Sequence, residues 1–351
     1  MSDLISVIIP AYNAEAFLNK TLDSVCAQTY RDLEIIVVND ASTDGTAAVI
    51  DRCAAMDSRI RVVHKQINEG VSYARNDALD LASGEYLLFV DGDDWIDPET
   101  CQRAMDSMAQ HGADLVMWSY IREVGGESRP KQIFDNDRIF GADEVREQLY
   151  RRMAGACGKE LARPENADAL CTVWGKLYRR DLIERHHIRF PDIRKTGTFE
   201  DGLFNLEALA HVKKAVFLDE YFYHYRRSLA GSLSTVYKAD LPQRWKYLFS
   251  LIRTHIQQNG LGPDFSQALS NRIALSLISL GINEAENPNG TRAVVRGLKH
   301  LIRDEEYRSA LRNLDLSPMP IHWKGYFLCA KLGCAWGLYG LLLVIQKIRG
   351  R

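Results

Sequence analysis

The first hundred residues alternate between short apolar runs and longer segments with helical spacing. The apolar runs are LISVIIP, LEIIVVND, IRVVHK and EYLLFVDGDD, and helical periodicity covers Ala14 to Gln28, Thr46 to Met56 and Val71 to Ala82. Strands that alternate with helices need crossover connections, which produce a largely parallel sheet with helices on both faces. The sequence therefore predicts an α/β fold with a Rossmann-like, mostly parallel sheet flanked by helices.

Composition and charge narrow the class of protein. The formal net charge of −2 over 351 residues argues against a nucleic-acid partner. Seven scattered cysteines form no C-x-x-C pair, which favours buried thiols in a reducing compartment. The N-terminal MSDLISVIIPAYN has no basic leader, so we interpret it as a first strand and not as a signal peptide. We therefore expect a cytoplasmic location.

The C-terminal region differs from the rest of the chain. From about Asp240 the pattern is helical, whereas EVGGESRP, residues 123–130, is predicted to be a loop. After Asp315 no acidic residue occurs, and Gly325 to Ile348 is apolar apart from two lysines. Two interpretations stay open: a helix in a membrane interface at the inner face of the cell membrane, or a helix docked on the protein's own core.

The chain is expected to have four parts. Residues 1–112 would form one substrate-binding half of a domain, and 113–238 would form its other half, which binds a second substrate. Residues 239–320 would form a helical extension, and 321–351 would form an apolar and basic segment that associates with a membrane.

Polar residues follow each of the predicted strands, at the edge of a parallel sheet where ligands usually bind. Asp91 and Asp93 alternate along an extended segment, so both can face one way, and Gly92 between them permits close approach of a ligand. Carboxylate oxygens suit Mg²⁺ or Mn²⁺, which commonly complete their coordination with substrate phosphates. The alternative is that these acids form a turn that caps the following helix.

Three further residues fall on the same predicted edge. Asp40 ends the second strand and could accept hydrogen bonds from a base or ribose, and Tyr12 offers a stacking face after the first strand. Arg75 lies on the helix that follows Gly70 and could pair with a diphosphate. Two of these residues have an ordinary alternative. Tyr12 could simply pack at the edge of the sheet, and Arg75 could lie on a solvated helix surface.

Together these segments resemble a known family. SVIIPAYNAEAFLNKTLDSVCAQTY, LEIIVVNDASTDGT, NEGVSYARNDAL and GEYLLFVDGDDW are similar, in this order, to the nucleotide-binding half of glycosyltransferase family 2, whose members are inverting enzymes with the GT-A fold. Weaker similarity in VWGKLYRRDLI and YHYRRSLAGSLST points to bacterial members that assemble polysaccharides or exopolysaccharides. The commonest form of the first of these has an asparagine where this chain has Gly175.

The resemblance implies roles for individual residues. Tyr12 would border the base, Asp40 would bind it, Arg75 would approach the diphosphate, Asp91 would contact the ribose side and Asp93 would coordinate the metal. The same segments add to the predicted donor site Pro10, Asn13, Glu15, Ser42 and Gly92. Residues proposed for the acceptor or the diphosphate are Trp174, Lys176, Arg226, Arg227 and Ser232.

The resemblance also implies a reaction. TFEDGLFNLEAL contains the acidic pair Glu200 and Asp201, of which Asp201 would be the general base and Glu200 the reserve. A sugar would pass from a nucleotide-diphosphate sugar, with UDP expected, to a glycan or lipid-linked glycan acceptor, with Mn or Mg as cofactor. The structural alternative is that the pair only favours the start of a helix.

Two other functions compete with this interpretation. A phosphatase-like hydrolase would use the first aspartate of D-x-D as a nucleophile, but the polar residues after the other strands would then have no role. A catalytically inactive scaffold that binds nucleotide sugars at the membrane would share every binding residue. A nicotinamide enzyme is disfavoured because no G-x-G-x-x-G follows the first strand.

Overall fold

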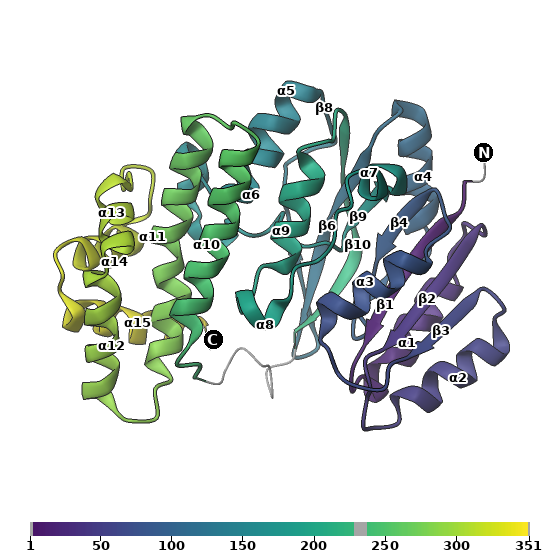
Figure 1. Cartoon of the computed structure of the whole chain (residues 1–351), viewed down its shortest axis with the longest axis horizontal. Helices are drawn as coiled ribbons and strands as arrows, with labels where there is room; N and C mark the ends of the chain where they lie inside the picture. The colour runs from purple at the N-terminus through teal and green to yellow at the C-terminus, as the bar shows by residue number, and fades with distance from the viewer. Residues whose placement is uncertain (1–2, 228–236, 350–351) are drawn as a thin grey trace. The chain divides into compact units, whose positions relative to one another are not determined.

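Four parallel strands form the N-terminal part of the sheet, because each is joined to the next through a helix (Figure 1). They are β1 (Ile5–Ala11), β2 (Leu33–Asn39), β3 (Ile60–His64) and β4 (Tyr86–Phe89), in the order β3-β2-β1-β4. The connecting helices are α1 (Glu15–Cys26), α2 (Thr46–Met56) and α3 (Val71–Leu81). This computed structural model describes residues 3–227 and 237–349, and it confirms the predicted strands and helices here.

The remaining strands continue the sheet in mixed directions. They are β5 (Trp95–Ile96), β6 (Leu115–Val124), β7 (Glu127–Lys131), β8 (Arg138–Phe140), β9 (Lys176–Arg179) and β10 (Ala215–Arg227). Strand β9 lies antiparallel between β4 and β6, while β10 runs parallel to β6. The helices of this part are α4 (Thr100–His111), α5 (Ala142–Glu144), α7 (Arg180–Arg185), α8 (Ile193–Thr196) and α9 (Glu200–Leu209).

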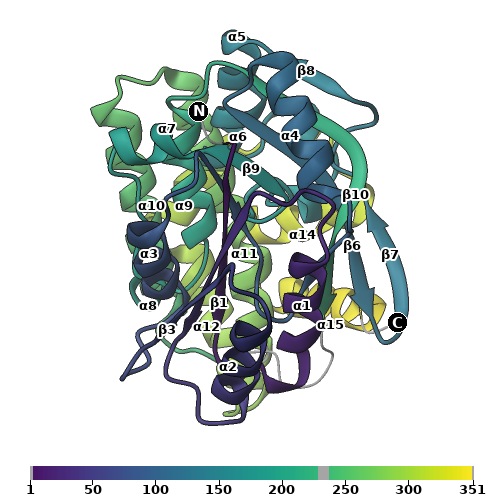
Figure 2. The same cartoon turned by 90° about the vertical axis from the view of Figure 1, so that its right-hand side faces the viewer.

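The predicted loop at residues 123–130 is wrong. The segment instead makes a hairpin, in which β7 pairs antiparallel with β6 beyond the tight turn at Gly125 and Gly126 (Figure 2). Pro130 is compatible with this strand because β7 pairs only with β6 and lies at an edge of the sheet. Proline has no backbone N–H to donate, and on the open side of an edge strand no neighbouring strand needs that hydrogen bond.

Both faces of β1 and β2 are buried, so the sequences of these two strands are nearly continuous apolar runs. Ile5, Val7 and Ile9 of β1 belong to a core cluster with residues of α1, α2 and α4. Successive side chains of a strand point to opposite faces of the sheet. Helix α3 also contacts β1 and β2 but contributes no residue to that cluster, so it covers the other face. The predicted α/β fold with helices on both faces is therefore confirmed.

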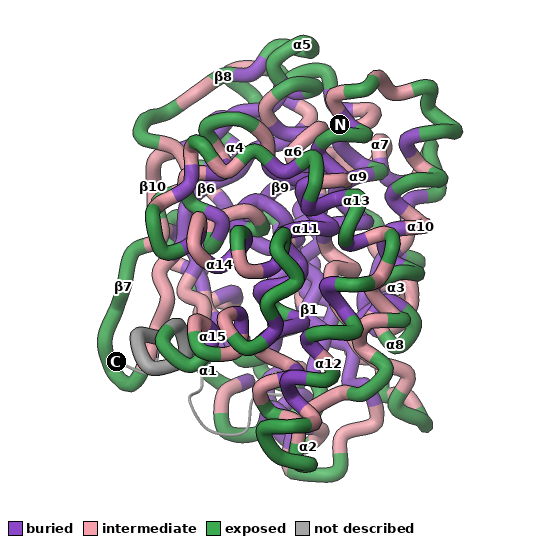
Figure 3. The backbone as a smooth tube through the Cα atoms, turned by 90° about the vertical axis from the view of Figure 1, so that its left-hand side faces the viewer, coloured by how far each residue is buried: buried purple, intermediate pink, exposed green. Residues whose placement is uncertain are grey.

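The chain divides into two compact units. Unit 1 comprises residues 1–149, 171–194 and 198–229, and unit 2 comprises residues 150–170, 195–197 and 230–351. The predicted division into four parts stays a prediction. Unit 2 is helical, and its long α11 is largely buried (Figure 3). Its main helices are α6 (Arg151–Ala154), α10 (Leu241–Gln258), α11 (Pro263–Ala285), α12 (Thr291–Arg303), α13 (Glu305–Asn313), α14 (Ile321–Lys331) and α15 (Ala335–Arg349). Three further helical segments are η1 (Val145–Tyr150), most of which belongs to unit 1, η2 (Gly158–Ala162) and η3 (Pro164–Asn166).

The apolar C-terminal region forms two helices in place of one. Residues 332–334 separate α14 from α15, and Gly333 takes a left-handed conformation there. Trp323, Tyr326 and Phe327 are buried, whereas Trp336 is 61% exposed. Within the described ranges, every helix is too short or too polar to cross a membrane. One face of this segment is therefore docked on unit 2 and another is open to solvent.

None of the seven cysteines, all of which lie in the described part of the chain, forms a disulfide. Cys53, Cys101 and Cys171 are buried, as expected for thiols that act as small apolar residues, but Cys334 is exposed, and for this residue the expected burial is wrong.

Candidate active site

The three acids of VDGDDW follow β4 and have three different environments. Asp91 is half-buried and accepts a hydrogen bond of 2.8 Å from the Arg75 guanidinium. Asp94 is fully buried and accepts from the Tyr223 hydroxyl at 2.6 Å and the Arg226 backbone N–H at 2.7 Å. Burial and the charges of Asp91 and Asp93 nevertheless raise the pKa of Asp94. Asp94 is therefore a structural residue of this turn.

Asp93 is the acid that remains open to a ligand. Its side chain is exposed at the surface. Partial desolvation of the carboxyl group by the surrounding protein, together with the charge of Asp91, raises the pKa of Asp93 to about 6. No group of three or more His, Cys, Asp or Glu side chains suited to a metal occurs among the described residues. Two carboxylates are still a fitting donor set for Mg²⁺ or Mn²⁺, which take remaining oxygens from phosphates and water.

Gly92 has a packing role that the sequence did not predict. A Cβ atom at this position would lie 2.8 Å from the Pro10 backbone oxygen and 3.5 Å from the Ala11 Cβ. Glycine is therefore required here by the close approach of β1, and the approach of a ligand to Gly92 stays a prediction. Pro10 contributes through this packing and is buried in β1.

Arg75 is the centre of a cluster of carboxylates. Its side chain is 3% exposed, and its guanidinium lies 2.6 Å from Asp201, 2.8 Å from Asp91 and 3.6 Å from Glu200. Burial opposes its charge, but the three carboxylates hold the pKa of Arg75 above its ordinary value. The alternative of a solvated helix surface is wrong. Arg75 joins the acids after β4 to the acidic pair of α9.

The acidic pair lies at the first turn of α9, after a left-handed Phe199 with φ of 68°. Asp201 uses both oxygens, accepting from Arg75 and, at 3.0 Å, from the Val173 backbone N–H. Burial raises its pKa despite the adjacent guanidinium. Burial and the charge of Asp201 raise the pKa of Glu200 to about 7. A buried pair of acids with raised pKa values is suited to accept a proton near neutral pH.

The loops after β1 and β2 are tied together by residues of the predicted donor site. Asn13 donates its backbone N–H to Ser42 and accepts from the Thr43 N–H, and Glu15 accepts from the Gly45 N–H at 2.9 Å. Asn13 also has a positive φ of 48°. Glu15, Asn13 and Ser42 therefore shape the loops. Tyr12 is 51% exposed, and its stacking on a base stays a prediction.

Asp40 is buried, and its carboxylate is used by the chain itself. It accepts from the backbone N–H groups of Glu69 at 3.0 Å and Gly70 at 2.7 Å. These bonds hold the segment that precedes α3, and so they position Arg75 indirectly. Binding of a base by Asp40 stays a prediction.

The residues predicted for the acceptor separate into buried and surface groups. Trp174 is 6% exposed and stacks on Tyr223 at 4.3 Å, which matches the open alternative that it belongs to the core. Lys176 is also buried, hydrogen-bonds the Thr172 carbonyl, and has its pKa lowered to about 8 by burial. Neither side chain is exposed for an acceptor.

Arg226 and Arg227 end β10 close to the acids. Arg226 donates to the Asp93 backbone oxygen at 2.9 Å, and its guanidinium lies over Phe17 and Trp95. Arg227 is exposed, and Ser232 lies outside the described residues. Arg226 is therefore placed to influence a charge at Asp93.

Sequence reasoning missed several residues that organise this site. Tyr223 bridges Asp94 and the Asp91 backbone N–H, and the Thr21 hydroxyl binds the backbone oxygens of Gly92 and Asp94. Asn205, one turn into α9, bonds the backbone oxygens of Asp201 and Cys171. Aromatic alternation in EYFYHYRR was the one available signal for Tyr223; a buried Asn or Thr carries none.

Comparisons with known proteins find relatives of this chain. The family model described as Glycosyl transferase family 2 matches residues 6–186. The uncharacterized glycosyltransferase EpsJ of Bacillus subtilis (strain 168) is 30% identical over 354 residues, which is 100% of this chain and 97% of the relative. Glycosyltransferase GlyA of Streptococcus pneumoniae is 35% identical over 247 residues, and the match spans 68% of this chain but 32% of GlyA.

Solved structures extend the likeness to the fold of the whole chain. S. aureus TarS residues 1–349 in complex with UDP-GlcNAc matches with a TM-score of 0.70 and 21% identity, covering 98% of this chain and 92% of that chain. A mannosyltransferase of Pyrobaculum calidifontis in complex with GDP-Man and Mn²⁺ matches with a TM-score of 0.51 and 19% identity, covering 97% and 84%. The predicted GT-A fold is confirmed by these likenesses.

Proposed function

The chain belongs to glycosyl transferase family 2 and is a glycosyltransferase, and we propose that it transfers a sugar with inversion from a nucleotide-diphosphate sugar to a hydroxyl group of a glycan. The observation that carries this proposal is the buried cluster in which Arg75 contacts both Asp91 and Asp201. It joins the acids expected at the donor to the acid expected at the acceptor.

The proposed reaction is a single displacement. The acceptor oxygen attacks the anomeric carbon, its proton passes to an Asp201 oxygen, and the bond from that carbon to the diphosphate oxygen breaks with its electron pair leaving on the diphosphate. Asp201 is held by the Val173 N–H as well as by Arg75, so its orientation is defined before the substrate arrives. A positioned base of this kind typically contributes a factor of about 10² to 10⁴.

Asp93 and Asp91 are the residues that would hold a divalent metal. Such an ion would supply positive charge to the departing diphosphate. Exposure of Asp93 supports access for an ion, and the P. calidifontis neighbour is in complex with GDP-Man and Mn²⁺. On the protein side, Arg226 beside Asp93 adds a fixed positive charge.

The proposed donor is a UDP-sugar. Support comes from the TarS structure with UDP-GlcNAc and from Tyr12, whose exposed ring suits a flat base. The proposed acceptor is a growing or lipid-linked glycan in bacterial polysaccharide synthesis. The named relatives are consistent with this, and they include the poly(ribitol-phosphate) beta-glucosyltransferase of Bacillus spizizenii, which is 30% identical over 224 residues. We further propose that the protein acts at the inner membrane surface through its C-terminal region.

The test is a set of nucleotide sugars assayed for binding with and without Mn²⁺, followed by mass measurement of products on candidate acceptors. We expect metal-dependent binding that Asp93→Ala weakens at least tenfold. The matched control is Asp106→Ala, which removes an exposed acid of α4. Donor binding that is unchanged by both Asp93→Ala and metal removal would refute the metal site. Binding without consumption of any donor would instead support the inactive scaffold.

A further inference from the structure

A basic pocket lies in unit 2 where three helices come together. Arg303 ends α12, Arg308 and Arg312 are one turn apart on α13, and Lys331 ends α14. These four side chains line an open pocket of about 830 Å³, together with apolar residues that include Leu332. Residues four apart on a helix lie on the same face. The pocket therefore concentrates four positive charges from three separate elements.

These charges are not neutralised by the protein. None of the carboxylates in the described ranges forms an ion pair with Arg303, Arg308 or Arg312, and all three side chains are exposed. Lys331 donates to the Leu314 backbone oxygen, which is a neutral acceptor. Asp315 is the acid whose charge is felt near Lys331, and it is engaged by the Ser317 N–H and hydroxyl. A net positive charge therefore remains in the pocket.

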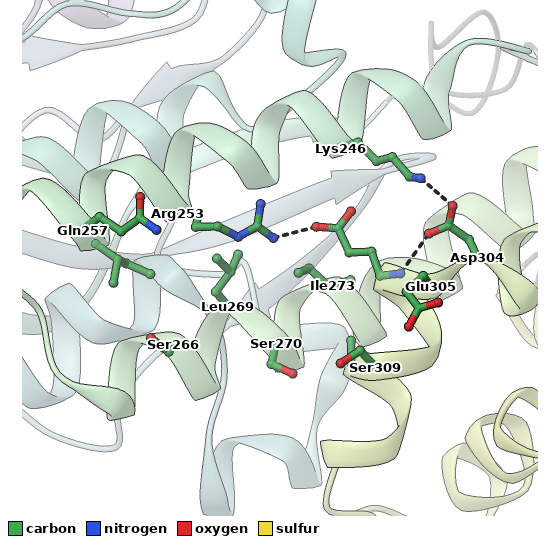
Figure 4. Close-up of a pocket in the computed structure, with 13 residues that line it drawn as sticks. Lys246, Arg253, Gln257, Ser266, Leu269, Ser270, Ile273, Asp304, Glu305 and Ser309 are labelled. Atoms are coloured by element: carbon green, nitrogen blue, oxygen red, sulfur yellow. Dashed lines mark hydrogen bonds and ion pairs between the residues drawn. The ribbon is translucent and has the colours of Figure 1, made fainter.

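The acids at the start of α13 are turned to a different side of the helix. Figure 4 shows Asp304 paired with Lys246 in a second pocket, which is lined by residues of α10, α11 and α13. The Asp304–Lys246 distance is 2.5 Å, and Glu306 in the same pocket pairs with Arg253 at 2.6 Å. Both acids thus bind cations of α10. Charge is segregated on α13, with acids toward α10 and arginines toward α14.

Apolar side chains border the basic pocket. Leu332 is 74% exposed and lines it, Leu328 precedes Leu332 by one turn and is 50% exposed, and Trp336 follows at 61%. The exposed parts of α13, α14 and α15 can be followed in Figure 3. Residues 316–351 contain no acidic residue. Exposed apolar residues beside basic ones are the combination that an interface of anionic lipid favours.

We propose that this pocket binds the phosphate of anionic lipid headgroups, with Leu328, Leu332 and Trp336 entering the headgroup region. The occupant follows from charge complementarity, because a second copy of the same positive pocket would repel the first. The proposal rests on the membrane location suggested above, but it is independent of the glycosyl transfer chemistry. It places the lipid contact on folded helices and not on a spanning segment.

The experiment is flotation of the full chain with vesicles of phosphatidylcholine alone or with about 30 mol% phosphatidylglycerol. We expect binding only to the anionic vesicles, weakened by salt. The triple variant Arg303→Gln, Arg308→Gln and Arg312→Gln should lose about a hundredfold in affinity, since each basic residue near such a surface contributes about a factor of five. A second variant, Leu332→Ser with Trp336→Ser, should reduce the binding that remains at high salt.

The matched control removes three exposed charges elsewhere, with Arg31→Gln, Lys159→Gln and Lys213→Gln. The proposal is supported if the control variant binds the anionic vesicles as well as wild type does while the pocket variant loses binding. Equal binding by the pocket variant, no binding by wild type, or binding of inorganic phosphate without vesicles would overturn it. Thermal melting and transfer to a soluble acceptor without vesicles are measured on every variant, so misfolding and failure of the proposed function are each recognised separately.

Discussion

Replacing Arg75 by methionine tests whether one cation holds the carboxylates of the site together. Methionine retains much of the side-chain volume but removes the guanidinium that contacts Asp91, Glu200 and Asp201. Because Arg75 is 3% exposed, water cannot readily replace it. Loss of one partner from a buried ionic group typically costs about 3–5 kcal/mol. We expect a loss of this size in the free energy of unfolding at about pH 8.

The same variant should show a characteristic dependence on pH. The folded-state pKa values of Glu200, about 7, and of Asp201 are already raised, and removal of Arg75 raises both further. A carboxyl group with a raised pKa binds its proton more tightly in the folded state, so protonation stabilises the fold as the pH falls through that pKa. The deficit relative to wild type should therefore be smaller at about pH 6 than at about pH 8.

Urea denaturation of both proteins at the two pH values measures this difference. The matched control is Arg194→Met, which removes an exposed arginine paired with Asp192 and should have a much smaller effect with no such dependence on pH. An Arg75→Met protein that is destabilised by less than about 1 kcal/mol, or equally at both pH values, would show that Arg75 does not hold these acids together.

Three further substitutions test other parts of the site and the sheet. Asp201→Asn should lower kcat by about 10² to 10⁴ while the donor Kd stays within a few-fold, and unchanged turnover in a transfer assay would remove Asp201 as the base. Glu34→Gln should destabilise the protein by about 2–3 kcal/mol in thermal or urea unfolding. Burial opposes the ionisation of Glu34, but hydrogen bonds from Ser6, Ser83 and Gly84 lower its pKa. The contribution of Glu34 to the free energy of unfolding is therefore present at neutral pH and is lost as the pH falls below the ordinary range of a glutamate. A variant as stable as wild type would contradict this. Gly92→Ala should cost about 1–3 kcal/mol, because its Cβ would meet the Pro10 oxygen, and an unchanged melting temperature would contradict that packing.

The N-terminal half of the fold could be predicted because its signals are local. Apolar runs of β-branched residues, helical spacing and turn residues each operate over a few positions, and they agree with one another between residues 5 and 96. The hairpin of β6 and β7 was missed because Gly125, Gly126 and Pro130 are typical of loops as well as of tight turns and edge strands. Local composition cannot separate these two structures.

The site was harder to predict because its partners are distant in sequence. Asp91 meets Arg75 across 16 positions, but Arg75 meets Asp201 across 126 and Asp94 meets Tyr223 across 129. Trp174 is a residue whose role the sequence could not decide. A tryptophan that stacks on a sugar and one that stacks on Tyr223 look the same in the sequence. Burial decides between them, and burial depends on the whole fold.

The mutual repulsion of the acids in VDGDDW is only partly offset, because each acid has different surroundings, and burial and the charges of neighbouring acids still raise the pKa values of Asp93 and Asp94. Asp91 has a buried guanidinium, Asp94 has a hydroxyl and a backbone N–H as donors, and Asp93 alone is left facing outward with a raised pKa. If a metal neutralised all three acids together, each would need an exposed oxygen, and the full burial of Asp94 excludes that. The charge that a bound metal and diphosphate would balance is therefore that of Asp93, with a share of Asp91, and not that of the whole motif.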